Sequence, residues 1–171
     1  RKTDSKDIDF IGYAVKELTG VTIEGGENTT MRFVTEADSK IKDVTLKNVD
    51  FEFETGANQV NGAFVVINKD AQIENLLIEG CTIVGDGNKN SYGIYGQNPN
   101  ATITVKKCTF SNLGYAIQAT AGGGYKALTV EESKFEGIIS WVIMPQYGSY
   151  AGISQNPLPI LGAVHACYRL G

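Results

Sequence analysis

Apolar and polar positions alternate along this chain in an eight-residue motif that recurs four times. Apolar residues occupy its first and third positions, a small or apolar residue its sixth, and a large apolar residue its eighth. The copies are Val44-Leu46-Val49-Phe51, Leu76-Ile78-Cys81-Ile83, Ile103-Val105-Cys108-Phe110 and Leu128-Val130-Ser133-Phe135, after a weaker relative at Val21-Ile23. A period of two is typical of a β-strand with one buried face. The motif therefore predicts two short strands that face one interior.

A two-residue gap interrupts the alternation in the middle of every copy. The gap pairs are Lys47-Asn48, Glu79-Gly80, Lys106-Lys107 and Glu131-Glu132. Asn, Gly and charged residues in this place favour a tight bend between the two strands. The equivalent positions on either side of the bend predict two interior rows, Val49/Cys81/Cys108/Ser133 and Phe51/Ile83/Phe110/Phe135, with Asp50, Thr82, Thr109 and Lys134 facing solvent.

The spacing of the motifs predicts a solenoid. Successive copies begin 32, 27 and 25 residues apart, and periods of about 20 to 50 residues are typical of solenoids and propellers. A third strand-like element with a glycine stands between motifs, at 12–15, 62–65, 92–95 and 114–117. We therefore predict an all-β fold: a parallel β-helix of about five coils, each with three short strands.

The segments from Ile73 to Ile83 and from Ile103 to Asn112 resemble repeats of the right-handed parallel β-helix superfamily, often called pectate-lyase-like. They are similar to β-helix repeats in surface proteins of gut bacteria. The resemblance covers roughly residues 8 to 137. It implies the hand of the coil and an extracellular or cell-surface location in a bacterium. The superfamily contains lyases, hydrolases and adhesins, so the resemblance is more specific for the fold than for an activity.

The composition changes at residue 138. Residues 138–171 contain no Asp, Glu or Lys, but they hold three of the four prolines and the single His and Trp. We predict a β-helix domain over residues 1–137 and a non-repetitive C-terminal segment over 138–171. The alternatives for that segment are a cap on the last coil, an interaction segment and an out-of-frame end. Its start, from Ile138 to Met144, also reads as the first strand of another coil.

Charge and cysteine content exclude several classes of protein. The net charge is -4 with a pI near 5.0, and only three of the 171 residues are arginines, which argues against a nucleic-acid partner. No apolar run reaches the roughly 20 residues of a membrane span.

Three cysteines do not suggest a disulfide framework, so we expect Cys81 and Cys108 to be stacked, buried thiols. Because the sequence starts at Arg1, we expect a mature or excised piece of a longer protein.

Two sets of residues are candidates for binding. Tyrosine combines a flat apolar ring with a polar tip, which suits contact with a sugar. We therefore predict a carbohydrate site at Tyr92, Tyr95 and Tyr125. Core packing is the competing interpretation for these side chains. The second set is Asp86, Asn88 and Asn90, which alternate as in a calcium loop. The loop then departs from that pattern at Ser91 and Gln97, so a plain polar turn is the alternative to a Ca²⁺ site.

No set of residues in the sequence forms a recognisable catalytic constellation. We therefore predict a non-catalytic extracellular domain of a bacterial surface protein, which binds a polysaccharide or cell-surface glycan or serves as an adhesin-like scaffold. The alternative is a polysaccharide lyase or glycoside hydrolase of the same fold, with its site incomplete in this chain. Carboxylates beside a Lys on adjacent coils would favour the enzyme, and the residues nearest the bend are Glu79, Lys106, Lys107 and Glu131. Nothing in the repeat predicts an oligomeric state.

Overall fold

The chain winds into a parallel β-solenoid of about four turns. The computed structural model describes residues 14–25, 31–52, 63–119, 124–144 and 160–161. These residues form strands and turns and contain no helix; accordingly, no helix among them is long and apolar enough to cross a membrane. The all-β parallel solenoid predicted from the sequence is confirmed, although the turns number about four rather than five.

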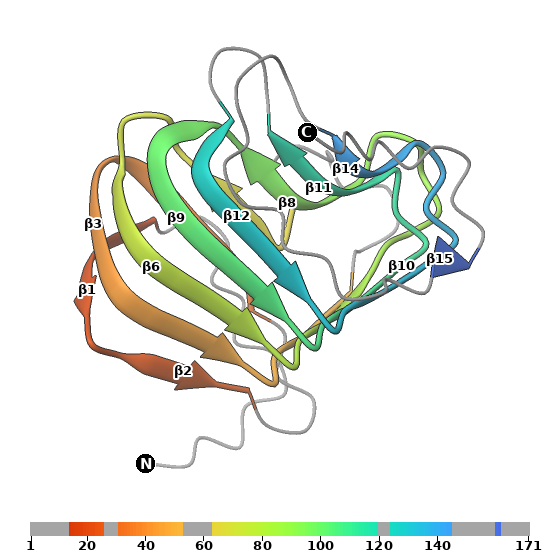
Figure 1. Cartoon of the computed structure of the whole chain (residues 1–171), viewed down its shortest axis with the longest axis horizontal. Coiled ribbons are helices and arrows are strands. Elements are labelled where there is room, and N and C mark those ends of the chain that lie inside the picture. Colours follow the sequence, from red (N-terminus) through yellow and green to blue (C-terminus); the bar gives the residue numbers. More distant parts are fainter. Residues whose placement is uncertain (1–13, 26–30, 53–62, 120–123, 145–159, 162–171) are drawn as a thin grey trace.

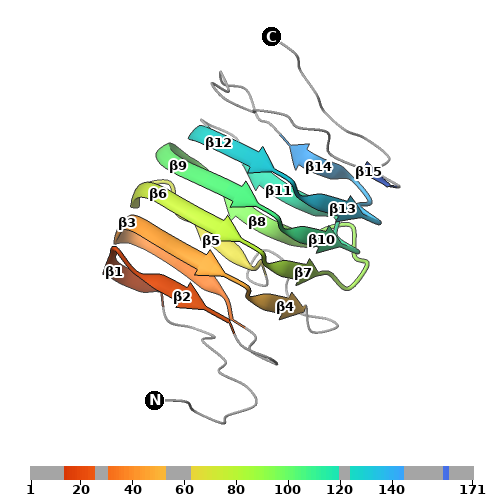
Figure 2. The same cartoon turned by 60° about the horizontal axis from the view of Figure 1, so that its bottom comes forward.

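Three sheets line the solenoid, and every strand pairing between coils is parallel. Sheet A contains β1 (Val15–Thr19), β2 (Thr22–Glu24), the second half of β3 (Phe33–Lys47), β6 (Gln72–Glu79), β9 (Asn98–Lys106) and β12 (Tyr125–Glu131). Sheet B contains β4 (Asp50–Glu52), β7 (Thr82–Val84), β10 (Thr109–Ser111), β13 (Lys134–Glu136) and β15 (Ile160–Leu161). Sheet C contains the start of β3, β5 (Val65–Ile67), β8 (Tyr92–Gly96), β11 (Tyr115–Ala119) and β14 (Trp141–Met144). Figure 1 shows the three sheets surrounding the interior of the coil. Figure 2 shows the strands of successive coils lying side by side.

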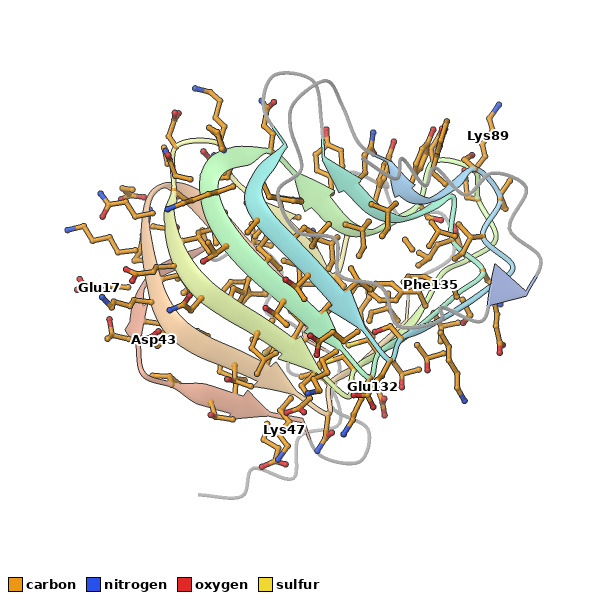
Figure 3. All side chains as sticks on the ribbon, viewed as in Figure 1. Glu17, Asp43, Lys47, Lys89, Glu132 and Phe135 are labelled. Atoms are coloured by element: carbon orange, nitrogen blue, oxygen red, sulfur yellow. The ribbon has the colours of Figure 1, made fainter. Side chains whose placement is uncertain are left out.

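The repeated apolar positions stack into rows inside the coil, as predicted. In sheet B the row runs through Phe51, Ile83, Phe110 and Phe135 in register. The rings of Phe110 and Phe135 are stacked, with centroids 5.2 Å apart and planes 13° apart. Figure 3 shows Phe135 pointing into the space between the sheets. Identical positions on successive coils therefore share one core.

The neighbouring interior row contains Val49, Cys81, Cys108 and Ser133, all of them buried. Cys81 and Cys108 are free, buried thiols, as expected from their shared place in the motif. The Cys108 sulfur lies 3.4 Å from the carbonyl oxygen of Ile78 and 3.3 Å from that of Lys106, within hydrogen-bonding distance of both. Its hydrogen bond with the Cys81 side chain and its burial raise the pKa of Cys108 well above the usual range for a thiol.

The predicted bend between the strands of each motif is a single residue in the left-handed region. The φ angles are 51° at Asn48, 64° at Gly80, 52° at Lys107 and 48° at Glu132. One such residue turns the chain from sheet A into sheet B on each coil, so the bends also stack. At the corner between the two sheets, Figure 3 shows Lys47 and Glu132 pointing away from the core.

Two parts of the segment 138–171 extend the sheets. A strand was expected between Ile138 and Met144 as the first of another coil. Strand β14 does form there, but it pairs with β11 in sheet C and so takes the third place in the coil, after β12 and β13. Strand β15 pairs with β13 in sheet B. Residues 145–159 and 162–171 lie outside the described residues. A cap, an interaction segment and an out-of-frame end therefore remain predictions for them, as does the domain boundary at residue 137.

Candidate carbohydrate-binding face on sheet C

The outer face of sheet C has two rows of side chains that run across the coils. One row contains Tyr92, Tyr115 and Trp141 in register. The other contains Val34, Val66, Tyr95 and Gln118. We call Tyr92, Tyr95, Tyr115 and Trp141 the aromatic patch. All four are half-buried, so each lies partly open to solvent.

The rings of the patch contact one another. The centroids of Tyr92 and Tyr115 are 4.9 Å apart, with planes 19° apart, and the two rings are stacked. Tyr95 lies 4.9 Å from Tyr92 at a tilt of 56°. The patch therefore combines a stacked pair of tyrosine rings with a third ring that is inclined to them.

A local bend of β8 brings Tyr92 and Tyr95 to the same side of the sheet. Gly93 and Ile94 are both buried, so two successive residues face inward between the tyrosines. A Cβ atom at Gly93 would lie 2.6 Å from the Ala116 carbonyl oxygen and 2.8 Å from the Phe110 ring. Glycine is therefore required at this position, because only a residue without a side chain fits this close approach.

The strands of the patch carry no formal charge. Strands β5, β8, β11 and β14 contain no Asp, Glu, Lys or Arg, whereas every strand of sheet A contains at least one. Burial, together with the neighbouring Tyr115 and Tyr95, raises the pKa of Tyr92. A phenol hydroxyl can both donate and accept a hydrogen bond.

Tyr125 lies apart from this patch. It begins β12 in sheet A and has 2% of its surface exposed. Its hydroxyl donates to the carbonyl of Gln118 at 3.4 Å. The register of β12 against β9 shifts between Tyr125 and Ala127. Of the three tyrosines predicted to contact carbohydrate, the structure thus brings Tyr92 and Tyr95 together and leaves Tyr125 in the core.

The loop of the predicted calcium site precedes Tyr92. The Asp86 Oδ1 atom accepts a hydrogen bond from the Asn88 backbone at 3.0 Å, and Asn88 Oδ1 accepts one from the Asn90 backbone at 3.0 Å. The loop closes where the Ser91 hydroxyl donates to the Asn88 carbonyl and accepts from the Gly114 backbone. Within the described ranges, no three His, Cys, Asp or Glu side chains gather as metal ligands. Two of the three predicted calcium ligands thus already hold the turn through their side-chain oxygens, and calcium binding there stays a prediction.

Three of the four residues named for an enzymatic site, Glu79, Lys106 and Glu131, lie in a row of alternating charge on sheet A. The fourth, Lys107, forms the bend after β9 and lies outside the row. The row runs through Glu24, Lys47, Glu79, Lys106 and Glu131 in register. Lys106 Nζ lies 3.6 Å from Glu131 Oε2, and Lys47 Nζ lies 3.7 Å from Glu24 Oε1. Opposite charges on neighbouring strands stabilise one register of the stack over others. Lys106 is therefore flanked by two carboxylate residues, but within a pattern that repeats along the sheet.

Two members of the aromatic patch, Tyr115 and Trp141, were not among the predicted binding residues. Each is followed by two successive buried residues, Ala116-Ile117 and Val142-Ile143, as Tyr92 is followed by Gly93-Ile94. The pairing of β8, β11 and β14 brings both into register with Tyr92.

Comparison with protein-family models, with curated proteins and with solved structures gives no match to this chain. The arrangement of its own side chains is therefore the basis for a functional interpretation.

Proposed function

We propose that this domain is a non-catalytic, extracellular β-solenoid scaffold that binds a glycan on the outer face of sheet C. The observation that carries the proposal is the aromatic patch, in which Tyr92, Tyr95 and Tyr115 lie within ring contact and Trp141 takes the next place in the row. Sugars present apolar C–H surfaces and hydroxyl groups together. Tyrosine and tryptophan match both features, because each combines an apolar ring with a polar tip.

The solenoid gives the patch a rigid support. The rings stand on strands β8, β11 and β14, each of which is paired in parallel with one or two neighbouring strands. Beneath the rings lie the buried side chains of Ile94, Ile117 and Ile143. A binding surface held in place in this way loses little conformational freedom when it meets a ligand. Such a support suits an adhesin-like segment of a bacterial surface protein, the setting that the sequence resemblance implies.

A screen on immobilised polysaccharides and glycan arrays tests the proposal. The wild-type chain should bind at least one glycan, and Tyr92→Ala with Tyr115→Ala should lose that binding. Thr104→Ala is the matched control, because Thr104 is a half-buried outward residue on sheet A, away from the patch. Circular dichroism of all variants checks that the solenoid is intact. If the wild-type chain retains no glycan and instead turns over a uronic-acid polymer, this proposal is wrong.

A second candidate function is that of a polysaccharide lyase or glycoside hydrolase. The observation that favours it is the place of Lys106 between Glu79 and Glu131 on adjacent coils of sheet A. A base beside carboxylates is the kind of arrangement that such chemistry uses. The alternation of the whole row, with Lys106 paired to Glu131, favours a structural role instead. Turnover of a polysaccharide that is abolished by Lys106→Ala and retained in Tyr92→Ala would establish the enzyme.

A further inference from the structure

The four strands β5, β8, β11 and β14 around the aromatic patch contain no charged residue. We infer that the aromatic patch binds an uncharged, hydroxyl-rich glycan chain and rejects acidic polysaccharides. This inference rests on the proposed function and adds to it the class of sugar. It depends on three features of the patch: the lack of charge in its strands, the hydroxyl groups of its tyrosines, and the direction of the aromatic row.

An acidic ligand would find no partner on the strands of the patch. The four strands β5, β8, β11 and β14 contain no Lys or Arg. The start of β3 is preceded by Arg32, whose Nε donates to the Ala63 carbonyl at 3.0 Å. Lys89 lies in the loop before Tyr92, and Figure 3 shows its side chain extending outward from that corner. A carboxylate brought against an uncharged surface loses hydration without gaining a counter-charge, which is unfavourable.

A neutral sugar finds suitable partners there. The hydroxyl groups of Tyr92 and Tyr115 can each donate and accept hydrogen bonds, as the hydroxyls of a sugar do. The tilted ring of Tyr95, beside half-buried Val66 in the neighbouring strand, offers an apolar surface for sugar C–H groups. The patch therefore matches a ligand whose polar groups are hydroxyls.

The row of Tyr92, Tyr115 and Trp141 follows the solenoid axis, because each residue belongs to a different coil. Neighbouring parallel strands lie about 4.8 Å apart, so the row spans roughly 10 Å. An extended, linear glycan that lies along this axis contacts three coils at once. Its affinity should rise with chain length until the three coils are covered and then level off.

Titration calorimetry of the full chain tests the inference. The ligands are neutral β-1,4-linked gluco- and manno-oligosaccharides of two to six units, and oligogalacturonides of the same lengths. Each series is measured at low and high NaCl concentration. We expect binding of a neutral series that strengthens with length, with a Kd that changes less than about twofold with salt, since charge screening acts only on ionic contacts. Oligogalacturonides should bind at least about tenfold more weakly.

Two conservative variants test the place of binding without removing the ring stack. Tyr92→Phe and Tyr115→Phe keep the apolar rings and delete the hydroxyls, so each should weaken neutral-glycan binding by about three- to tenfold, the usual effect of one lost hydrogen bond. Thr104→Ala on sheet A again serves as the control and should bind as the wild type does. Unchanged affinity in both tyrosine variants would place the ligand elsewhere and overturn the inference.

The outcomes separate this inference from the proposed function. Salt-sensitive binding of oligogalacturonides alone would overturn the neutral ligand class and leave glycan binding standing. Absence of binding to both these series and the glycan array would overturn both proposals. Sedimentation of the chain as a dimer that dissociates in Tyr92→Ala would assign the patch to contact with a second copy, which also overturns the inference.

Discussion

The left-handed bend between sheets A and B predicts stability changes of opposite sign at equivalent positions. Lys107 and Gly80 occupy the same place on neighbouring coils, with φ angles of 52° and 64°. A side chain in this region costs about 1–2 kcal/mol, and glycine costs about 0.5–1 kcal/mol of extra chain entropy on folding. Lys107→Gly should therefore stabilise the domain by about 0.5–1 kcal/mol.

The reverse change should destabilise the neighbouring coil. Gly80→Ala introduces a Cβ at positive φ, and that atom would lie 2.5 Å from the Asn48 side-chain oxygen. The strained backbone alone accounts for about 1–2 kcal/mol, and displacement of the Asn48 side chain adds to it. We expect a net loss of about 1–2 kcal/mol, because alanine restricts the unfolded chain and returns part of the cost.

Urea unfolding followed by circular dichroism measures both changes. Gly87→Ala is a control for the backbone effect alone, since Gly87 has a φ of 76° and a Cβ atom added there would meet nothing within 4 Å. Lys134→Gly is a control for glycine in a strand and should destabilise. If Lys107→Gly destabilises the domain as much as Lys134→Gly does, the left-handed bend is not the conformation of the folded chain.

Three further predictions concern the core and the patch. Phe110→Ala should lower the free energy of unfolding by about 3–5 kcal/mol in urea titrations, because it removes a buried ring that stacks on its neighbour. Cys81 and Cys108 should react with Ellman's reagent only on unfolding, because both are buried. The third cysteine of the sequence, Cys167, is replaced by serine in this experiment so that only these two thiols are counted. The pKa of Tyr92 is raised in the fold, so its contribution to stability is present below its unfolded pKa of about 10 and is lost as the pH rises through the folded pKa. Stability measured in alkaline urea titrations should therefore fall less in Tyr92→Phe than in the wild type.

Each of these predictions has a clear contrary result. A loss below about 1 kcal/mol for Phe110→Ala would mean that the ring is not packed in the core. Fast modification of the native thiols would contradict their burial. Identical loss of stability above about pH 10 in wild type and Tyr92→Phe would show that Tyr92 does not titrate differently in the fold.

The rows of the core were predictable because the motif repeats its spacing. Phe51, Ile83, Phe110 and Phe135 keep the same distance from the bend, and the structure places them in register. The bend itself was predictable from the gap in the alternation. That Lys107 and Glu132 adopt a left-handed conformation there was not, since their residue types do not favour it and the stacked strands on both sides impose it.

The aromatic patch was only partly predictable. Tyr92 and Tyr95 are three residues apart, which places them on opposite faces of a regular strand, and the two successive inward residues between them remove that conflict. The loops that lead into sheet C differ in length, so the sequence did not align Tyr115 with Tyr92. Tyr125 was predicted to contact carbohydrate, but its burial agrees with the competing interpretation of core packing, and the irregular start of β12 against β9 accompanies that burial.

The central claim is that a neutral glycan binds on the outer face of sheet C, and its most direct test is a mapping of the contact by NMR. A ¹⁵N-labelled sample of this 18.4 kDa chain is titrated with the neutral oligosaccharide that calorimetry selects. Binding on the outer face of sheet C should produce amide shift changes concentrated in β8, β11 and β14, around Tyr92, Tyr115 and Trp141. Shift changes concentrated instead in β6, β9 and β12, around Lys106, would contradict it.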